Sequence, residues 1–200
     1  MQEDESQAHL CTFLAFDTET TGLAGNENTR LIEIAWVKGT FSSHDAETWQ
    51  YLIKPVRMLV PDKITELTGI TDEMLCTSGI PARDAISAFS DAVKTSDCVI
   101  AHNMSFDKTI IADECSRLGI PDPLSKAYLF CTMKAGVRYR KRNTNRPQKK
   151  TISLINLHKA IFGTVPPTSH RALPDAISCA RCAWILAKSD TFPENGAFGR

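Results

Sequence analysis

The sequence has no excess of either charge, since 23 lysines and arginines balance 23 aspartates and glutamates. Overall charge therefore predicts no particular partner. No apolar run approaches the roughly 20 residues that a membrane-spanning helix needs, so we expect no membrane association. Residues 1–9 are acidic and polar, unlike a signal or transit peptide, and are expected to form a disordered tail.

The cysteines show no disulfide framework, because the seven of them are odd in number and irregularly spaced. This pattern favours reduced thiols in an intracellular compartment, and we expect a cytoplasmic protein, or a nuclear one in a eukaryote. Cys179 and Cys182 lie three residues apart on an expected helix, but a zinc site needs two further ligands. We therefore expect two buried thiols there.

The chain length predicts a single domain. Two hundred residues suffice for one well-packed core, and no internal repeat or linker divides the sequence. We expect the domain to span residues 10–188, followed by a C-terminal tail over residues 189–200.

The pattern of apolar runs and turn residues predicts three strands, then strands that alternate with helices. Strands are expected at 10–16, 31–38, 48–53, 98–101 and 128–132. Helices are expected at 62–67, 82–94, 105–118, 153–162 and 173–188, with a helical turn that begins at residue 71. Ser105 and Ser153 are candidate N-caps. This order predicts an α/β fold with a mixed five-stranded sheet, its first three strands antiparallel, flanked by helices.

Asp17 and Glu19 lie two residues apart at the end of the first apolar run. On a strand, both carboxylates point to the same face, where they repel each other and lose hydration. A bound cation resolves that repulsion, and hard oxygen ligands suit Mg²⁺ or Mn²⁺. The pair therefore predicts a metal site with further ligands elsewhere in the chain.

Two later segments supply acidic residues at the starts of expected helices. Asp107 falls in the first turn of the helix that follows strand 98–101. Asp175 falls in the first turn of the last helix, where Pro174 is tolerated, and His170 lies in the loop before it. Because open α/β sheets place their sites at strand ends, we expect these residues to meet.

In this order, the three segments resemble the Exo I, Exo II and Exo III motifs of the DEDDh, or DnaQ-like, exonucleases. Asp17 and Glu19 match the first motif, Asp107 in His-Asn-x-x-Phe-Asp matches the second, and His170 with Asp175 matches the third. The similarity covers nearly the whole chain and includes a Gly-Ile-Thr segment at residues 69–71. The chain is similar to proofreading exonucleases of the DNA polymerase III epsilon type and to RNase T.

The resemblance implies a ribonuclease H-like fold, two Mg²⁺ or Mn²⁺ ions, and release of nucleoside 5′-monophosphates from single-stranded 3′ ends. By resemblance, Asp17 bridges both ions, and Glu19 and Asp175 complete the site of the ion that carries the attacking water. Asp107 then holds the second ion. His170 is the implied general base, because histidines in general titrate near neutral pH.

The resemblance also implies contacts with the terminal nucleotide. The candidate substrate-binding residues are Thr18, Thr20, Gly22, Leu23, His102, Asn103 and Phe106. For His102 and Asn103, the alternative is hydrogen bonding that braces the turn. For Phe106, stacking on a base and packing in the core both stay open.

A run of basic residues without any acid occupies residues 138–150 and is expected to form a mobile loop beside the site. Its members are Arg138, Arg140, Lys141, Arg142, Arg146, Lys149 and Lys150. Attraction to the phosphates of a nucleic acid strand is one interpretation. A solvated loop or a localisation signal is the other.

The sequence therefore predicts a metal-dependent 3′→5′ exonuclease of the proofreading or repair type, acting on single-stranded DNA. An exoribonuclease that trims RNA 3′ ends stays open, because contacts with the 2′-hydroxyl are not readable here. A non-catalytic module that binds nucleic acid or protein on the same fold ranks lower, because all five motif residues are present. A polymerase or repair partner and a homodimer follow only from the resemblance.

Overall fold

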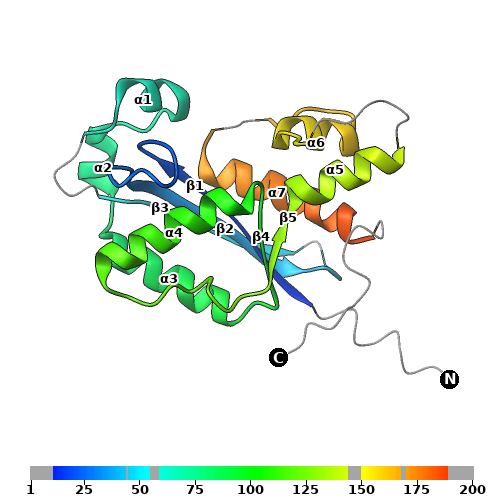
Figure 1. Cartoon of the computed structure of the whole chain (residues 1–200), viewed down its shortest axis with the longest axis horizontal. Coiled ribbons are helices and arrows are strands. Elements are labelled where there is room, and N and C mark those ends of the chain that lie inside the picture. The colour runs from blue at the N-terminus through cyan, green and yellow to red at the C-terminus, as the bar shows by residue number, and fades with distance from the viewer. Residues whose placement is uncertain (1–10, 44, 55–58, 144–149, 168–169, 189–200) are drawn as a thin grey trace.

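The computed structural model describes residues 11–43, 45–54, 59–143, 150–167 and 170–188. The two expected tails lie outside the described residues. The strands are β1 (Thr12–Thr20), β2 (Leu31–Thr40), β3 (Ala46–Leu52), β4 (Cys98–Ala101) and β5 (Leu129–Cys131). They form one sheet in the order β3-β2-β1-β4-β5, in which β1, β2 and β3 pair antiparallel and β4 and β5 run parallel to β1 (Figure 1). The predicted mixed sheet is confirmed.

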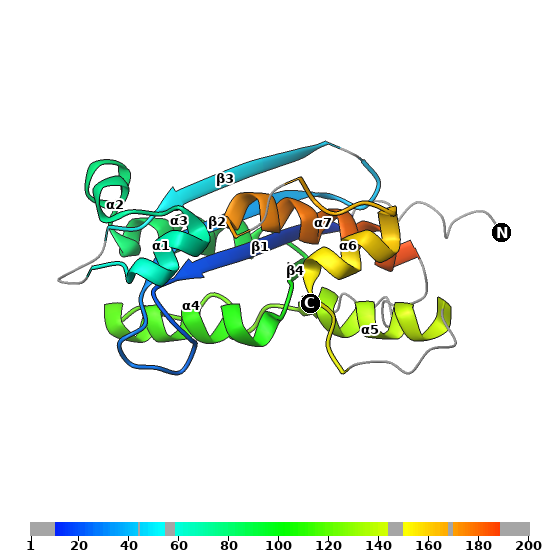
Figure 2. The ribbon, with the colours of Figure 1, turned by 90° about the horizontal axis from the view of Figure 1, so that it is seen from above.

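Helices cover both faces of this sheet. They are α1 (Asp62–Thr68), α2 (Asp72–Ser78), α3 (Ala82–Lys94), α4 (Met104–Leu118), α5 (Thr132–Asn143), α6 (Leu154–Phe162) and α7 (Ala172–Lys188). Helices α3 and α4 pack on one face, and α5, α6 and α7 pack on the other. Helices α1 and α2 lie at the end of the sheet to which β1 points (Figure 2). None of the helices in the described part of the chain is long and apolar enough to cross a membrane.

Strand β1 is apolar on both faces because each face is covered. Leu14 and Phe16 enter the core beneath α3 and α4, whereas Phe13 and Ala15 enter the core beneath α5, α6 and α7. Asp17 and Glu19 continue the row of Phe13 and Ala15. The two carboxylates therefore project toward the face that α7 covers.

Several predicted strand and helix limits near the site differ from the structure, and the prediction lacks helix α5, which begins at Thr132, the last residue of a predicted strand. Strand β1 continues to Thr20, so Asp17 and Glu19 lie on the strand itself. Helix α4 begins at Met104 with Asn103 at the N-cap position, and the prediction of Ser105 there is wrong. Asn103 has φ 69°, a left-handed conformation that asparagine adopts more readily than most residues. Ser153 is confirmed as an N-cap, because its side chain accepts from the Asn156 amide.

The basic run over residues 138–143 is helical and forms the second half of α5, so the predicted loop is wrong there. Arginine and lysine are good helix formers, and the first half of α5 supplies the packing. Gly136 permits close contact with α6, because a Cβ atom there would lie 2.7 Å from Cδ1 of Leu157. Residues 144–149, which include Arg146 and Lys149, lie outside the described residues.

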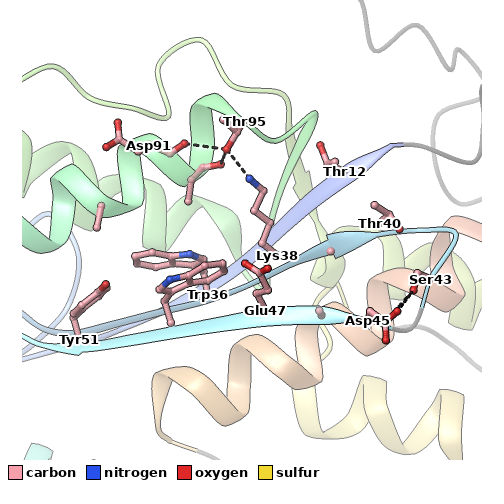
Figure 3. A pocket seen from close by; sticks show the side chains of 15 residues that line it. Thr12, Trp36, Lys38, Thr40, Ser43, Asp45, Glu47, Tyr51, Asp91 and Thr95 are labelled. Atoms are coloured by element: carbon pink, nitrogen blue, oxygen red, sulfur yellow. Dashed lines mark hydrogen bonds between the residues drawn. The ribbon is translucent and has the colours of Figure 1, made fainter.

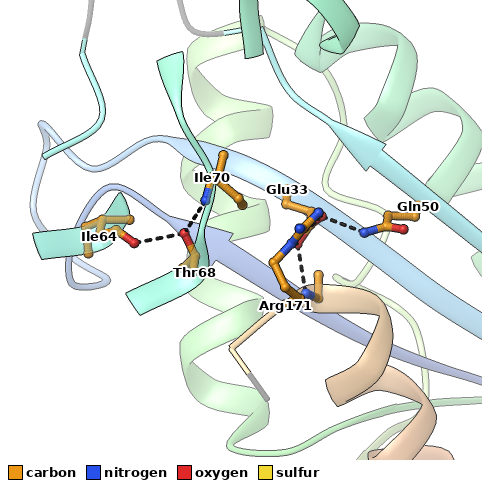
Figure 4. Close-up of polar contacts among 7 residues, drawn as sticks. Glu33, Gln50, Ile64, Thr68, Ile70 and Arg171 are labelled. Atoms are coloured by element: carbon orange, nitrogen blue, oxygen red, sulfur yellow. Dashed lines mark hydrogen bonds and ion pairs between the residues drawn. The ribbon is translucent and has the colours of Figure 1, made fainter. Parts of the chain in front are cut away.

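The Gly-Ile-Thr segment ends α1, as its glycine predicts. Gly69 has φ 72° and donates its amide to the Thr65 carbonyl. The Thr68 hydroxyl donates to the Ile64 carbonyl and accepts from the Ile70 amide (Figure 4). Ile70 is then directed into a small apolar cluster with Ile32. The cluster fixes α1 and α2 against the start of β2.

Candidate functional site

Three of the four predicted acidic residues converge at the end of β1. Asp17 and Glu19 on β1 and Asp175 on α7 each offer an oxygen, and these oxygens all lie within 4.8 Å of one another. All three residues are half-buried. A set of hard oxygen donors at this spacing suits a divalent cation.

Asp107, from the first turn of α4, lies beside this group of three and is only 2% exposed. The Thr18 hydroxyl donates a 2.8 Å hydrogen bond to Oδ1 of Asp107. The charge of Asp107 also raises the pKa values of Asp17 and Glu19, which places it in the same electrostatic cluster. The hydroxyl of Thr18, a predicted substrate contact, is therefore directed at a carboxylate.

The acidic cluster is electrostatically strained when it holds no cation. Burial and the neighbouring carboxylates raise the pKa of Asp17 well above its usual range. Burial, followed by the charge of Glu33, raises the pKa of Glu19 to about 8. Burial raises the pKa of Asp107 to about 7 and also raises that of Asp175. Perturbed carboxyl groups that share one site are typical of metal or catalytic centres.

His170 lies at the rim of the cluster, two residues before the start of α7, and is exposed to solvent. Its amide donates a 2.8 Å hydrogen bond to Oδ2 of Asp175. His170 has φ 61°, a left-handed conformation that is unfavourable for a residue with a Cβ atom. The structure thus brings all five motif residues to one end of the sheet.

The last residue of β1 and the loop after it carry three of the predicted substrate contacts. Thr20 donates through its hydroxyl to the Gly22 carbonyl, and Thr29 donates to the Leu23 carbonyl. A Cβ atom at Gly22 would lie 2.9 Å from Oγ1 of Thr29, so the loop requires glycine there. The Leu23 side chain is 79% exposed, an unusual state for leucine that leaves it available for contact with a ligand.

The residues before Asp107 brace the turn between β4 and α4. Nε2 of His102 donates to the Ile152 carbonyl at 2.9 Å, and Nδ1 lies 2.9 Å from Oγ1 of Thr132. Burial lowers the pKa of His102 to about 4, so its ring is neutral. Both ring nitrogens are therefore occupied by partners within the chain. Phe106 packs partly against the α3 and α4 core and keeps an exposed part.

A separate cavity of about 700 Å³ lies on the opposite face of the sheet, between α3 and the strands β2 and β3 (Figure 3). Trp36 and Tyr51 are among the residues that line it. None of the five motif residues does. In this molecule, clustered charge indicates the candidate site, and the size of a hollow does not.

Sequence reasoning did not single out Glu33 or Arg171. Glu33 on β2 is buried and forms an ion pair with Arg171, with a distance of 2.6 Å between Oε1 and Nη2 (Figure 4). The signal was present, because Glu33 is the one charged residue in the apolar run Leu31 to Val37. A lone carboxylate in a buried strand requires a partner.

Comparison with known proteins gives a consistent result. A sequence model of the exonuclease family RNase_T matches residues 14–182. PolC-type DNA polymerases III of Streptococcus pyogenes serotypes M18 and M5 are each 38% identical over 113 residues. These alignments cover 56% of this chain and only 7% of each polymerase.

The fold has a counterpart among solved structures. The crystal structure of cell-death related nuclease 4 superposes with a TM-score of 0.72 at 15% identity, covering 90% of this chain and 65% of that one. This likeness supports the ribonuclease H-like exonuclease fold. The match of the family model over residues 14–182 shows that the chain is a nuclease domain that belongs to the DnaQ-like exonuclease family RNase_T.

Proposed function

We propose that this protein is a metal-dependent 3′→5′ exonuclease that releases nucleoside 5′-monophosphates from single-stranded 3′ ends, with DNA as the preferred substrate. The convergence of Asp17, Glu19 and Asp175 within 4.8 Å, beside the buried Asp107, carries this proposal. Family membership supports phosphodiester hydrolysis. The likeness to PolC-type DNA polymerases supports a DNA substrate and a polymerase partner.

The donor set fits Mg²⁺ or Mn²⁺, because all of its ligand atoms are carboxylate oxygens. Asp17, Glu19 and Asp175 would hold one ion, and Asp107 together with Asp17 would hold a second. Two such ions, when bound, neutralise charge on the phosphate and lower the pKa of water. Their binding would also relieve the mutual repulsion of the carboxylates.

His170 would act as the general base at the rim of this cluster. In the proposed reaction, a water oxygen bonds to the phosphorus of the terminal nucleotide while His170 takes the proton of that water. The bond from phosphorus to the 3′-oxygen of the preceding nucleotide then breaks, and that oxygen takes a proton from solvent. The terminal nucleotide leaves as a 5′-monophosphate, and the shortened strand keeps a 3′-hydroxyl.

Two exposed features would guide the strand. Leu23, on the loop after β1, would pack against the terminal nucleotide. The basic half of α5, with Arg138, Arg140, Lys141 and Arg142, would attract phosphates farther along the strand.

A single-strand degradation assay tests the proposal. A 5′-labelled DNA oligonucleotide with Mg²⁺ should yield a ladder that shortens from the 3′ end, and the released product should be nucleoside 5′-monophosphate. A chelator should abolish shortening. Asp17→Asn should lower the rate at least about a hundredfold, because it removes a charge from the centre of the ligand set.

The control variant is Asp97→Asn. The Asp97 carboxylate accepts hydrogen bonds from the amide and hydroxyl of Thr12. Thr12 is the first residue of β1, so this contact lies at the end of the strand away from the acidic cluster. Its loss should leave the degradation rate near that of the wild type. Faster degradation of a matched RNA strand would replace DNA with RNA as the preferred substrate. Strand binding without cleavage in Mg²⁺ would overturn the proposal in favour of a non-catalytic module.

A further inference from the structure

Glu33 is a fully buried carboxylate that stands outside the group of three clustered oxygens. It lies on β2, directly opposite Glu19 on β1 in the sheet register. A buried carboxylate this close to a candidate metal centre has two available roles. It either binds the metal or holds other parts of the site in place.

The contacts of Glu33 decide between these roles. Oε1 accepts from Nη2 of Arg171 at 2.6 Å and from Nε2 of Gln50 at 2.7 Å. Oε2 accepts from the Ala172 amide at 2.8 Å, and Nε of Arg171 lies 3.1 Å from it. Donors from the chain itself therefore occupy both oxygens, and little acceptor capacity remains for a cation.

These contacts fix the beginning of α7. Figure 4 shows the Arg171 side chain reaching from the start of α7 to Glu33 on the sheet. Arg171 and Ala172 lie between His170 and Asp175. The Glu33 carboxylate therefore binds the chain at a point between the two motif residues. The Asp175 amide donates to the Arg171 carbonyl, and the His170 amide donates to Asp175. This closed turn holds His170 in its unfavourable left-handed conformation.

We propose that Glu33 is a positioning residue, which anchors the start of α7 through Arg171 and the Ala172 amide and thereby sets His170 and Asp175 against β1. The inference rests on the proposed function of His170 and Asp175. It connects β2 with the segment that carries His170 and Asp175, through a residue that is not itself a proposed metal ligand.

Glu33→Gln is the most direct variant. Glutamine keeps the length of the side chain but replaces one acceptor oxygen with an NH₂ donor, which must then face either Arg171 or the Ala172 amide. The start of α7 should loosen. We expect kcat to fall at least about tenfold with KM within about twofold, since the loss acts through misplaced catalytic groups.

Two readouts do not depend on cleavage. Hydrogen exchange at the Ala172 amide should be at least about tenfold faster in Glu33→Gln, because either orientation of the glutamine amide opposes one donor, Arg171 or the Ala172 amide, and so loosens the start of α7. Mn²⁺ titration followed by electron paramagnetic resonance should show affinity weakened about three- to tenfold, because Asp175 is a proposed ligand. If the wild type cleaves no strand, the proposed function fails, yet these two readouts still test Glu33.

A double-mutant cycle separates positioning from general destabilisation. In a His170→Ala background, Glu33→Gln should lower the residual rate much less than it does in the wild type. Asp97→Asn is the matched control and should change neither the hydrogen exchange of the Ala172 amide nor the Mn²⁺ affinity. If Glu33→Gln does not fold, Arg171→Met removes the same ion pair from a side chain that is 31% exposed. Unchanged amide exchange and Mn²⁺ affinity, or independent effects in the cycle, would overturn the proposal.

Discussion

The hydroxyl of Thr18 donates a 2.8 Å hydrogen bond to Oδ1 of Asp107, which joins β1 to the first turn of α4. Thr18 and Asp107 are 6% and 2% exposed, so water does not substitute for this contact. The bond also lowers the pKa of Asp107 against the upward effect of burial. Alternate residues of β1 thus have different tasks, because Asp17 and Glu19 face α7 while Thr18 supports the carboxylate from α4.

Thr18→Val removes this hydroxyl at nearly constant volume and leaves a buried carboxylate oxygen without its donor. We expect a stability loss of about 1–3 kcal/mol in urea unfolding. The Mg²⁺-dependent degradation rate should fall about tenfold, because Asp107 is no longer held in place. Thr18→Ser keeps the hydroxyl and should retain most of the rate. Equal rates in the two variants would show that the hydrogen bond does not matter for the site.

The raised pKa values make the metal-free protein sensitive to pH. Burial and neighbouring charges raise the pKa of Glu19 to about 8, and burial raises that of Asp107 to about 7. In the unfolded chain such groups titrate near pH 4. Between about pH 4 and pH 8, the folded protein therefore binds more protons than the unfolded chain, and the free energy of unfolding falls as pH rises. The stability that these protonated carboxyl groups add to the folded state is fully present below about pH 4. It is lost as the pH rises to about 8.

Thermal unfolding in a chelator at pH 5 and pH 8 measures this effect. The wild-type Tm should be lower at pH 8, and Glu19→Gln, which does not titrate, should show a smaller decrease. Mg²⁺ at pH 8 should raise the wild-type Tm more than that of Glu19→Gln, because binding to the folded state stabilises it. Glu47→Gln on the exposed strand β3 should behave as the wild type does. Parallel decreases in the wild type and Glu19→Gln would contradict the prediction.

The central part of the fold was predictable because its determinants are local. The Phe13 to Phe16 run, buried on both faces, predicts a central strand, and Gly69 and Gly119 predict the ends of α1 and α4. The site was predictable for a different reason. Asp17 with Glu19 and the start of α7 carry acidic residues in segments that resemble the motifs of one exonuclease family, and the order of those motifs predicts that the residues meet.

The remaining errors reflect tertiary contacts. The second half of α5 has little apolar periodicity, and its helix depends on packing of Ala135 and Gly136 against α6 and α7. Asn103 is the N-cap of α4 through its backbone conformation, so a search for a capping side chain selects Ser105 instead. Glu33 has its role only because Arg171, 138 positions later, folds back onto it. No local pattern connects those two residues.

Leu23→Ala tests the loop after β1. Leu23 is 79% exposed, so its truncation should cost little stability, whereas the lost apolar contact should raise KM for a single strand about three- to tenfold. The kcat should stay within about twofold, since the metal ligands are untouched. Leu59→Ala is the matched control, because Leu59 is 75% exposed on another segment. An equal KM in the two variants would remove Leu23 from the proposed strand path.

The basic half of α5 should influence how strongly single-stranded DNA binding depends on salt concentration. Lys141→Gln combined with Arg142→Gln removes two exposed positive charges without removing a helix former. If this part of α5 contacts phosphates, the double variant should bind single-stranded DNA more weakly at low salt. The slope of log affinity against log salt concentration should also decrease by roughly 0.7 for each lost contact.

Fluorescence anisotropy with a labelled strand in Ca²⁺, over a series of salt concentrations, measures both quantities in this α5 variant. The control combines Lys63→Gln with Lys126→Gln, which removes the same charge from exposed positions on α1 and on the segment before β5. Because the two double variants have the same net charge, a general loss of attraction would affect both slopes equally. A decrease confined to the α5 variant assigns the strand path to that helix, whereas equal slopes would leave its arginines and lysine as a solvated surface.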